Sequence, residues 1–328
     1  MKSLVTGATG FIGNNLVYEL LNRQHKVNVL VRSPHKLSEK LKNKITLFEG
    51  DLFANEEMEK AMKNCDCVFH MAAFANIWSK DKSLARRTNV EGTQNILHAA
   101  VKNNVKKVVF TSSAATLPPS ADKEEVDETF PTPDSYLTDY ETTKREAELI
   151  CKDFAKQGLH TVIVQPPRVF GPGKMSKSNS VTLMIKKYIK GTWRIIPGSG
   201  VQIGNYAYIQ DVVNGHILAL EHGKSGERYI LGGTNASYNQ FFETIKEVSE
   251  KNYRMFHMPF PVMLGVAKFE LFMAESFGKK PLITPPWIIR YMQNRLVSSE
   301  KAKNDLKYNI TPLDEAIAKT IDWINSKK

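Results

Sequence analysis

A glycine-rich turn near the start of the chain is the feature that most constrains its fold. The sequence TGATGFIG carries Gly7, Gly10 and Gly13 between a short apolar segment and a segment with helical periodicity. Glycine permits a tight turn and lets backbone N–H groups approach a pyrophosphate, and the N-terminus of the following helix adds partial positive charge. Because strand, turn and helix follow in this order, the pattern favours a dinucleotide-binding βα unit over an ordinary turn.

The first half of the chain alternates between strand-like and helix-like segments. Strands are expected at residues 3–6, 27–31, 45–49, 67–71, 107–111 and 161–165, and helices at 11–23, 55–63, 81–103 and 136–157. Such alternation with short connections predicts an α/β protein with a doubly wound, Rossmann-type parallel sheet. We expect this NADP-binding domain to comprise residues 1–170, with 205–235 returning to it. Residues 171–204 and 236–328 are expected to form a smaller, mostly helical C-terminal substrate lobe.

Composition narrows the class of protein. The three cysteines, Cys65, Cys67 and Cys151, match no zinc motif, so we expect no metal site and a reducing compartment. The start has no apolar signal segment, and no run of about 18 uncharged apolar residues occurs, so we expect a cytoplasmic chain without an integral membrane span. The net charge of +11 comes from scattered lysines without an arginine–aromatic platform. We therefore expect a small-molecule substrate and no nucleic acid.

The residues that follow the second expected strand bear on which dinucleotide binds. NAD sites usually place an acidic residue here to hold the ribose hydroxyls. In this chain Val31 is followed by Arg32 and Lys36, and the first acidic residue is Glu39. A guanidinium suits a 2′-phosphate because it makes bidentate, charge-assisted contacts. We therefore expect NADP, with NAD as the alternative; the other interpretation is that both cations are ordinary surface residues.

A serine, a tyrosine and a lysine form the candidate catalytic set. Tyr140 and Lys144 are spaced i, i+4 on an expected helix, so they share one face. A nearby ammonium is expected to lower the pKa of the phenol, which is otherwise near 10. Ser113 ends the strand VVFTSS, at the sheet edge where ligands bind in doubly wound folds. Its hydroxyl is placed to polarise a substrate carbonyl.

Taken together, these motifs resemble the extended short-chain dehydrogenase/reductase family. The resemblance is carried by TGATGFIG at 6–13, GDL at 50–52, HMAA at 70–73, Asn89 in TNVEGT, FTSSAAT at 110–116, YETTK at 140–144 and PPRVFGPG at 166–173. It extends to YIQDV at 208–212, GERYILGG at 226–233 and the tail VSSEKAKNDLKYNITPLDEAIAKTI, and so covers nearly the whole chain.

The family resemblance implies roles for the matched positions. Ser113, Tyr140 and Lys144 would be catalytic, and Asn89 would brace the central helix near them. A carbonyl held by Ser113 would receive hydride from the reduced nicotinamide and a proton from Tyr140; the reverse reaction is equally permitted. The residues expected to contact the cofactor are Gly7, Thr9, Gly10, Phe11, Ile12, Gly13, Arg32, Lys36, Asp51, Leu52, Met71, Ala72, Ala73, Tyr140, Lys144, Pro166 and Val169.

Several functions within this family remain open. The segments VLVRSP and PPRVFGP are most similar to the dihydroflavonol-reductase and 3β-hydroxysteroid-dehydrogenase branch, which acts on hydrophobic, often cyclic molecules. The main alternative is a nucleotide-sugar epimerase or dehydratase with tightly bound NAD. Arg168 argues against it, because sugar-nucleotide members usually carry an asparagine at the matching place, although Arg168 is itself able to meet an anion. A non-catalytic NADP-binding sensor is a further alternative, but it would be expected to lose Tyr140 or Lys144.

The region 255–290 is unusually apolar. Its large side chains are Met255, Phe256, Met258, Phe260, Met263, Leu264, Phe269, Phe272, Met273 and Trp287. Three interpretations remain open, namely a lobe core, a hydrophobic substrate pocket and a peripheral membrane face flanked by lysines. A homodimer built on two long helices is also an expectation from the family.

Overall fold

The computed structural model describes residues 1–175 and 179–327, and its central feature is a seven-stranded parallel sheet. The strand order is β10-β6-β5-β4-β1-β2-β3, and every pairing between neighbours is parallel. The strands are β1 Lys2–Thr6, β2 Lys26–Val31, β3 Thr46–Glu49, β4 Cys67–His70, β5 Lys107–Thr111, β6 His160–Val164 and β10 Arg228–Tyr229. After β3 the chain crosses back to place β4 on the other side of β1, so the sheet is doubly wound, as expected.

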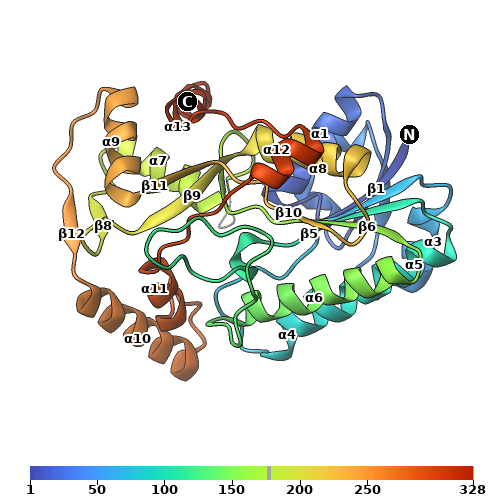
Figure 1. Cartoon of the computed structure of the whole chain (residues 1–328), viewed down its shortest axis with the longest axis horizontal. Helices are drawn as coiled ribbons and strands as arrows, with labels where there is room; N and C mark the ends of the chain where they lie inside the picture. Colours follow the sequence, from blue (N-terminus) through green and yellow to red (C-terminus); the bar gives the residue numbers. More distant parts are fainter. Residues whose placement is uncertain (176–178, 328) are drawn as a thin grey trace.

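Helices cover both faces of this sheet (Figure 1). One face is covered by α1 (Phe11–Asn22) and α8 (Ile209–His222), and the other by α3 (Asn55–Met62), α5 (Gly92–Lys102) and α6 (Asp139–Lys156). Successive strand residues therefore enter different cores: in β1, Val5 packs with α1, whereas Leu4 packs with α3 and α5. This two-sided burial explains why the strands are continuous apolar runs rather than alternating ones.

Two helices differ from their expected extents. The expected helix 81–103 is divided into α4 (Ser83–Arg86), a π-helical turn (Arg87–Glu91) and α5. The expected helix 136–157 begins only at Asp139, because the Thr138 side chain caps it in a capping box with Glu141. These changes place Asn89 within the π-helical turn and Tyr140 in the first turn of α6.

The remaining elements lie mostly in the C-terminal half of the chain. The helices are α2 Glu39–Lys42, α7 Ser180–Ile189, α9 Tyr238–Ser249, α10 Phe260–Phe277, α11 Pro285–Tyr291, α12 Glu300–Leu306 and α13 Leu313–Asn325. Five short strands accompany them: β7 (Arg168–Phe170), β9 (Ile203–Tyr208) and β11 (Thr234–Ser237) form one small sheet, and β8 (Ile195–Pro197) pairs with β12 (Phe256–Met258). Sequence analysis did not predict these five strands. Within 205–235, β10 joins the large sheet, whereas residues 205–208 of β9 and 234–235 of β11 lie in the three-stranded one.

Two further properties concern the whole described chain. All three cysteines are buried and unpaired, and burial raises the pKa of the Cys65 and Cys67 thiols to about 11 and that of Cys151 further still. Across residues 1–175 and 179–327, no helix combines the length and apolar character needed to cross a membrane.

Candidate active site

The glycine turn joins the carboxyl end of β1 to α1 in a conformation that its residues require. Gly7 has φ +75°, and a Cβ there would lie 2.6 Å from the backbone nitrogen of Ala72, which follows β4. The N–H of Gly10 donates to the Gly7 carbonyl over 2.9 Å, and a Cβ on Gly13 would overlap that same carbonyl. The backbone of the turn therefore lies close to the segment after β4 and to the start of α1. Such a turn leaves the N–H groups at the N-terminus of the helix open to a pyrophosphate.

A buried hydrogen-bond chain fixes the neighbouring carboxyl end of β4. The Thr6 hydroxyl accepts from the N–H groups of Met71 and Ala72 at 3.2 Å each. His70 lies between Thr6 and Thr93, with its Nδ1 2.7 Å from one hydroxyl and its Nε2 3.0 Å from the other. Burial lowers the pKa of His70 to about 3, so the ring is neutral at physiological pH. The backbone after β4 is thereby held against the glycine turn.

The expected adenosine-side residues lie beyond β2 and β3. Arg32 and Lys36 are exposed just after β2, and within residues 1–175 and 179–327 no ion pair compensates either charge. Asp51 is exposed, and its carboxylate accepts the N–H of Phe53 over 2.8 Å, which fixes the turn after β3. Leu52 is buried against Gly92, where a Cβ would approach the Leu52 side chain to 2.5 Å. All four residues thus follow carboxyl ends of adjacent strands.

The hydroxyls of Ser113 and Tyr140 meet at the carboxyl end of β5. Ser113 follows the strand and accepts the N–H of Ala115 over 3.2 Å, which orients its side chain. Its hydroxyl lies close enough to the Tyr140 phenol to lower the pKa of that phenol. Burial raises the pKa of Tyr140 above its usual value, and the contributions that lower it, from Ser113 and the Arg290 charge, do not outweigh this effect. The phenol is therefore protonated at neutral pH.

Lys144 lies one turn further along α6 but is engaged elsewhere. Its ammonium donates to the Thr111 carbonyl over 2.7 Å and lies 4.8 Å from the centre of the Phe110 ring. Burial lowers the pKa of Lys144 to about 8. The expectation that this ammonium lowers the pKa of Tyr140 is wrong for this structure, because the side chain points to the end of β5 and the charge that acts on the phenol belongs to Arg290.

Asn89 and Pro166 connect the segments around these side chains. The Asn89 amide accepts the Phe74 N–H over 2.6 Å and donates to the Phe74 carbonyl and the Thr143 hydroxyl, each over 3.0 Å. It therefore ties the loop after β4 to α6, next to Lys144. Pro166 is buried and its carbonyl accepts the N–H of Ala114 over 3.1 Å, which places it beside Ser113. Val169 is buried in β7 nearby.

A cavity of about 180 Å³ adjoins the phenol. One wall is the loop that follows β4, with Trp78, and the other is made by α10 and α11, with Leu271 and Trp287. The Tyr140 and Trp287 ring centres are 6.4 Å apart. About half of the lining is aromatic or aliphatic, and the rest is polar or charged, namely Asn76, Ser79, Asp81, Lys82, Thr138, Asp139, Glu275 and Thr284. Such a cavity suits a hydrophobic molecule whose reacting group faces Tyr140.

Residues near the site that sequence analysis did not assign come from α11 and the segment after it. The Arg290 guanidinium pairs with Glu141 over 2.6 Å, and Arg295 pairs with the same carboxylate over 3.4 Å. Arg295 also donates to the carbonyl of Leu117 over 3.0 Å, in the loop that follows Ser113. These partners lie about 150 residues apart in the sequence, and no local motif marks Trp287 or either arginine as belonging to the site.

Arg168 is held among aromatic rings. Its guanidinium donates to the hydroxyls of Tyr206 and Tyr238, each over 3.0 Å. It also lies 5.0 to 5.9 Å from the ring centres of Tyr206, Tyr238 and Tyr291. In this structure it therefore contacts phenol groups rather than an acidic residue. Tyr291 stacks near Trp287, with 6.0 Å between ring centres, so the cluster borders the wall of the cavity.

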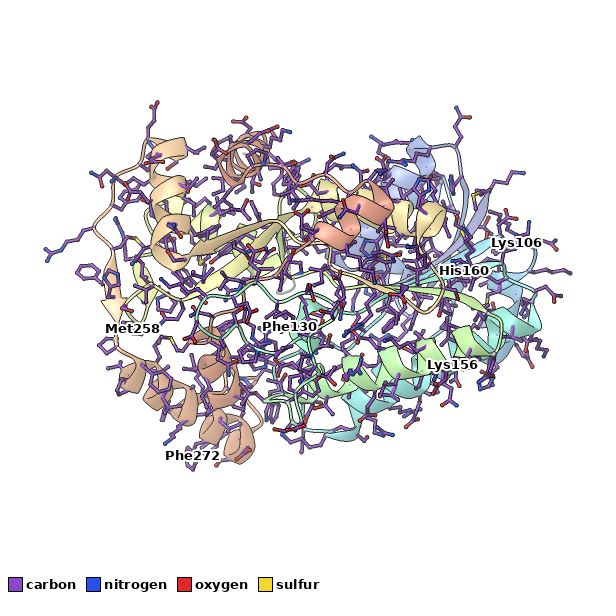
Figure 2. The ribbon with its side chains drawn as sticks, in the orientation of Figure 1. Lys106, Phe130, Lys156, His160, Met258 and Phe272 are labelled. Atoms are coloured by element: carbon purple, nitrogen blue, oxygen red, sulfur yellow. The ribbon has the colours of Figure 1, made fainter. Side chains whose placement is uncertain are left out.

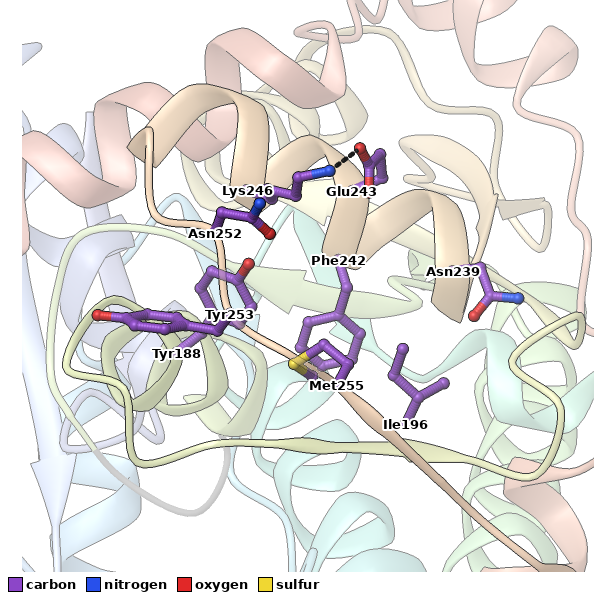
Figure 3. A pocket seen from close by; sticks show the side chains of 9 residues that line it. All are labelled: Tyr188, Ile196, Asn239, Phe242, Glu243, Lys246, Asn252, Tyr253 and Met255. Atoms are coloured by element: carbon purple, nitrogen blue, oxygen red, sulfur yellow. Dashed lines mark hydrogen bonds and ion pairs between the residues drawn. The ribbon is translucent and has the colours of Figure 1, made fainter.

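A larger cavity, of about 310 Å³, lies away from the candidate catalytic residues (Figure 3). It is lined by residues of α7, α9 and the segment before β12, among them Tyr188, Phe242 and Met255. Lys246 and Glu243 form an ion pair with each other at its edge. Because none of Ser113, Tyr140 or Lys144 lines it, we do not assign the reaction to this cavity.

Comparison with known proteins agrees with this geometry. The model of the NAD dependent epimerase/dehydratase family matches residues 3–232. The chain is 29% identical over 327 residues to a putative dihydroflavonol 4-reductase of Synechocystis sp., covering 98% of this chain and 94% of the relative. It is 29% identical over 344 residues to a decarboxylating sterol-4-alpha-carboxylate 3-dehydrogenase of Candida albicans, covering 98% and 97%. The crystal structure of gox2253 superposes with a TM-score of 0.82 at 30% identity, covering 99% of this chain and 98% of that one.

Proposed function

The chain belongs to the NAD dependent epimerase/dehydratase family, and within it we propose an NADP(H)-dependent oxidoreductase that interconverts a carbonyl and a hydroxyl on a hydrophobic or cyclic small molecule. That the chain is an NAD(P)-dependent dehydrogenase or reductase acting on hydroxyl or carbonyl groups follows from its family and relatives. The observation that carries the finer proposal is the proximity of the Ser113 hydroxyl to the Tyr140 phenol, which itself lines the cavity between the loop after β4 and the helices α10 and α11.

The fit of the cofactor rests on the glycine turn. The space beside Gly7 and Gly13 accepts no side chain, so backbone N–H groups at the start of α1 are left to bind the pyrophosphate. The exposed Arg32 and Lys36 would hold the 2′-phosphate, because the acidic residue that favours NAD is lacking after β2. The cofactor riboses would lie along Met71, Ala72 and Ala73, and the nicotinamide would contact Pro166 and Val169. The bound nicotinamide supplies or accepts the hydride.

The residues of this chain supply the proton and the polarisation. Ser113 donates a hydrogen bond to the substrate oxygen and so polarises the carbonyl. Tyr140, whose raised pKa keeps it protonated at neutral pH, donates the proton when the substrate is reduced. Lys144, whose ammonium is held at the carbonyl of Thr111 at the end of β5, would bind the nicotinamide ribose. A protonated phenol is the form of Tyr140 that reduction requires near neutral pH.

The first test removes the proton donor. We expect Tyr140→Phe to bind NADPH as tightly as the unmodified chain but to reduce cyclic ketones at least ~1,000-fold more slowly, within the range of acid catalysis and orientation combined. The matched control is Tyr18→Phe, which removes a hydroxyl whose hydrogen-bond partner is the Ser38 side chain, far from the candidate site. Turnover by Tyr140→Phe at the rate of the control would overturn the catalytic assignment.

The second test concerns the cofactor. Titration with NADPH and NADH should show a preference for NADPH that Arg32→Asp reverses, because a carboxylate repels the 2′-phosphate and accepts ribose hydroxyls. Lys26→Asp makes the same change of charge at the opposite, amino end of β2 and should leave the preference unchanged. If the purified chain instead keeps NAD(H) through gel filtration and shows no preference, the epimerase alternative is favoured.

A further inference from the structure

The outward face of α10 is an exposed apolar surface that neither the fold nor the candidate site explains. Val262, Val266, Phe269 and Phe272 repeat at intervals of three and four residues, so they form one stripe along the helix. Their exposed fractions are 51%, 50%, 62% and 58%. In Figure 2 the labelled Phe272 projects from the tip of the molecule, away from its body. An apolar stripe of this kind on a surface marks an interaction site rather than a core.

The other faces of α10 have identified neighbours. Met263, Ala267 and Ala274 are buried on the side that packs against α11. Leu271 and Glu275 line the cavity that contains Tyr140. One face of α10 therefore belongs to the core of the lobe and another lines the candidate substrate cavity. Neither role accounts for the outward stripe.

Charge around the stripe is mainly positive. Lys268 is exposed beside it, and Lys279 and Lys280 are exposed just beyond the C-terminus of α10. Of the two acidic residues of the helix, Glu270 is engaged by the N–H of Leu282 over 3.0 Å and Glu275 lines the cavity. Phe277 and Leu282, 66% and 76% exposed, extend the apolar surface towards the lysines. The face is thus apolar in its centre and basic at its edge, which suits an anionic lipid surface.

We propose that α10 lies in the surface of an anionic lipid bilayer, with Val262, Val266, Phe269 and Phe272 among the acyl chains and Lys268, Lys279 and Lys280 at the headgroups. A second copy of this chain is a poorer occupant, because a two-fold interface would bring these lysines towards their own counterparts. Binding at the interface also agrees with a helix too short and too interrupted by charge to span the membrane.

The position of α10 connects this surface to the reaction. Because the same helix forms a wall of the cavity, docking would bring the cavity towards the lipid phase, where a hydrophobic substrate is concentrated. This consequence rests on the proposed function, whereas the docking itself does not. The two are therefore tested separately.

The test measures flotation with vesicles in the absence of substrate and NADPH. The full chain should float with vesicles of three parts phosphatidylcholine to one part phosphatidylglycerol, less with pure phosphatidylcholine, and less at 0.5 M salt. Phe269→Ser/Phe272→Ser should reduce binding at least ~10-fold, because two large apolar side chains would no longer be transferred from water into the acyl chains. Lys279→Glu/Lys280→Glu should abolish the preference for the anionic lipid.

Matched controls exclude a general effect of surface changes. Val101→Ser/Val201→Ser removes two apolar side chains that are 52% and 59% exposed on other elements, and it should bind like the unmodified chain. Reduction of a water-soluble ketone should be equal in the Phe269→Ser/Phe272→Ser variant and the unmodified chain, since neither phenylalanine lines the cavity. Equal flotation of the Phe269→Ser/Phe272→Ser variant and the unmodified chain, or concentration-dependent dimers that this variant loses, would overturn the proposal.

Discussion

The site is built from a few residues whose conformations leave little freedom for substitution. Gly7 is the clearest of them, because it combines a positive φ with backbone contact to the segment after β4. Ser113 and Tyr140 depend instead on the fold around them. Their hydroxyls come close because β5 ends just before Ser113 and α6 begins just before Tyr140. Residues of the first kind are recognisable in a sequence, whereas the second kind needs the fold.

We predict that Gly7→Ala weakens both the fold and cofactor binding. The added methyl group would lie 2.6 Å from the Ala72 nitrogen in a conformation that alanine avoids, so the free energy of unfolding should fall by roughly 2 kcal/mol. Urea unfolding and NADPH titration measure the two effects. Gly265→Ala is the control, because its Cβ meets open space within a helix, and there stability should rise by up to about 1 kcal/mol. Unchanged NADPH affinity in Gly7→Ala would contradict the role assigned to the turn.

Sequence reasoning placed the glycine turn and the Ser, Tyr and Lys positions, because each lies in a local pattern next to a strand or helix. It misjudged the charge that acts on Tyr140. The i, i+4 spacing brings Lys144 onto the same face of the helix, but it does not show that the Thr111 carbonyl attracts the ammonium. Arg290 was missed because its approach to Glu141 depends on how α11 packs against α6, which no local spacing encodes.

At the scale of elements, the strand ends are held in register by buried polar side chains. The chain from Thr6 through His70 to Thr93 links β1, β4 and α5 directly behind the expected cofactor site. The long parallel strands were predicted to within one or two residues, because they are continuous apolar runs. The five strands of the smaller sheets were not, because four of them span only three or four residues and their pairings join segments far apart in the sequence.

His70 makes this link sensitive to pH. Its pKa is lowered to about 3 in the fold and returns to about 6.5 on unfolding, so the unfolded chain gains a proton first as the pH falls. The stability that depends on the neutral ring is therefore complete above pH 6.5 and is lost towards pH 3. Between pH 7 and 5 this loss should be about 2 kcal/mol.

Urea unfolding of His70→Gln at both pH values measures the effect. This variant should be less stable than the unmodified chain at pH 7 but should lose less stability between pH 7 and 5. The exposed His35→Gln serves as the control and should follow the unmodified chain. Parallel pH dependences of all three proteins would show that His70 does not carry the effect.

At the scale of the whole molecule, a buried ion pair joins the two halves of the site. Glu141 lies in the first turn of α6 on the large sheet, whereas Arg290 and Arg295 come from the C-terminal region. Three charges share one small volume there, and burial together with the neighbouring Arg290 lowers the pKa of Arg295 to about 10. Glu141 is the carboxylate that pairs with both arginines, so its loss would leave two buried cations without a partner of opposite charge.

A double-mutant cycle tests this dependence. Glu141→Gln should lower the free energy of unfolding by about 3 kcal/mol, because it leaves two buried guanidinium groups without a carboxylate. Arg290→Gln should cost less stability, and the pair should show a coupling energy of at least about 1 kcal/mol. The exposed pair Lys102–Glu59 is the control cycle and should couple by under about 1 kcal/mol.

Arg290→Gln should also move the ascending limb of the pH–rate profile of alcohol oxidation to higher pH. Oxidation needs the tyrosinate, and the Arg290 charge lowers the Tyr140 pKa.

The burial of all three cysteines has a practical consequence for labelling. Their thiols have raised pKa values and no access to solvent, so the native chain offers maleimide reagents almost no reactive thiolate. A Phe269→Cys variant would therefore accept one fluorophore at one known position without prior removal of the natural cysteines. The emission maximum of an environment-sensitive dye at that position would report directly whether the end of α10 lies in water or among lipid acyl chains.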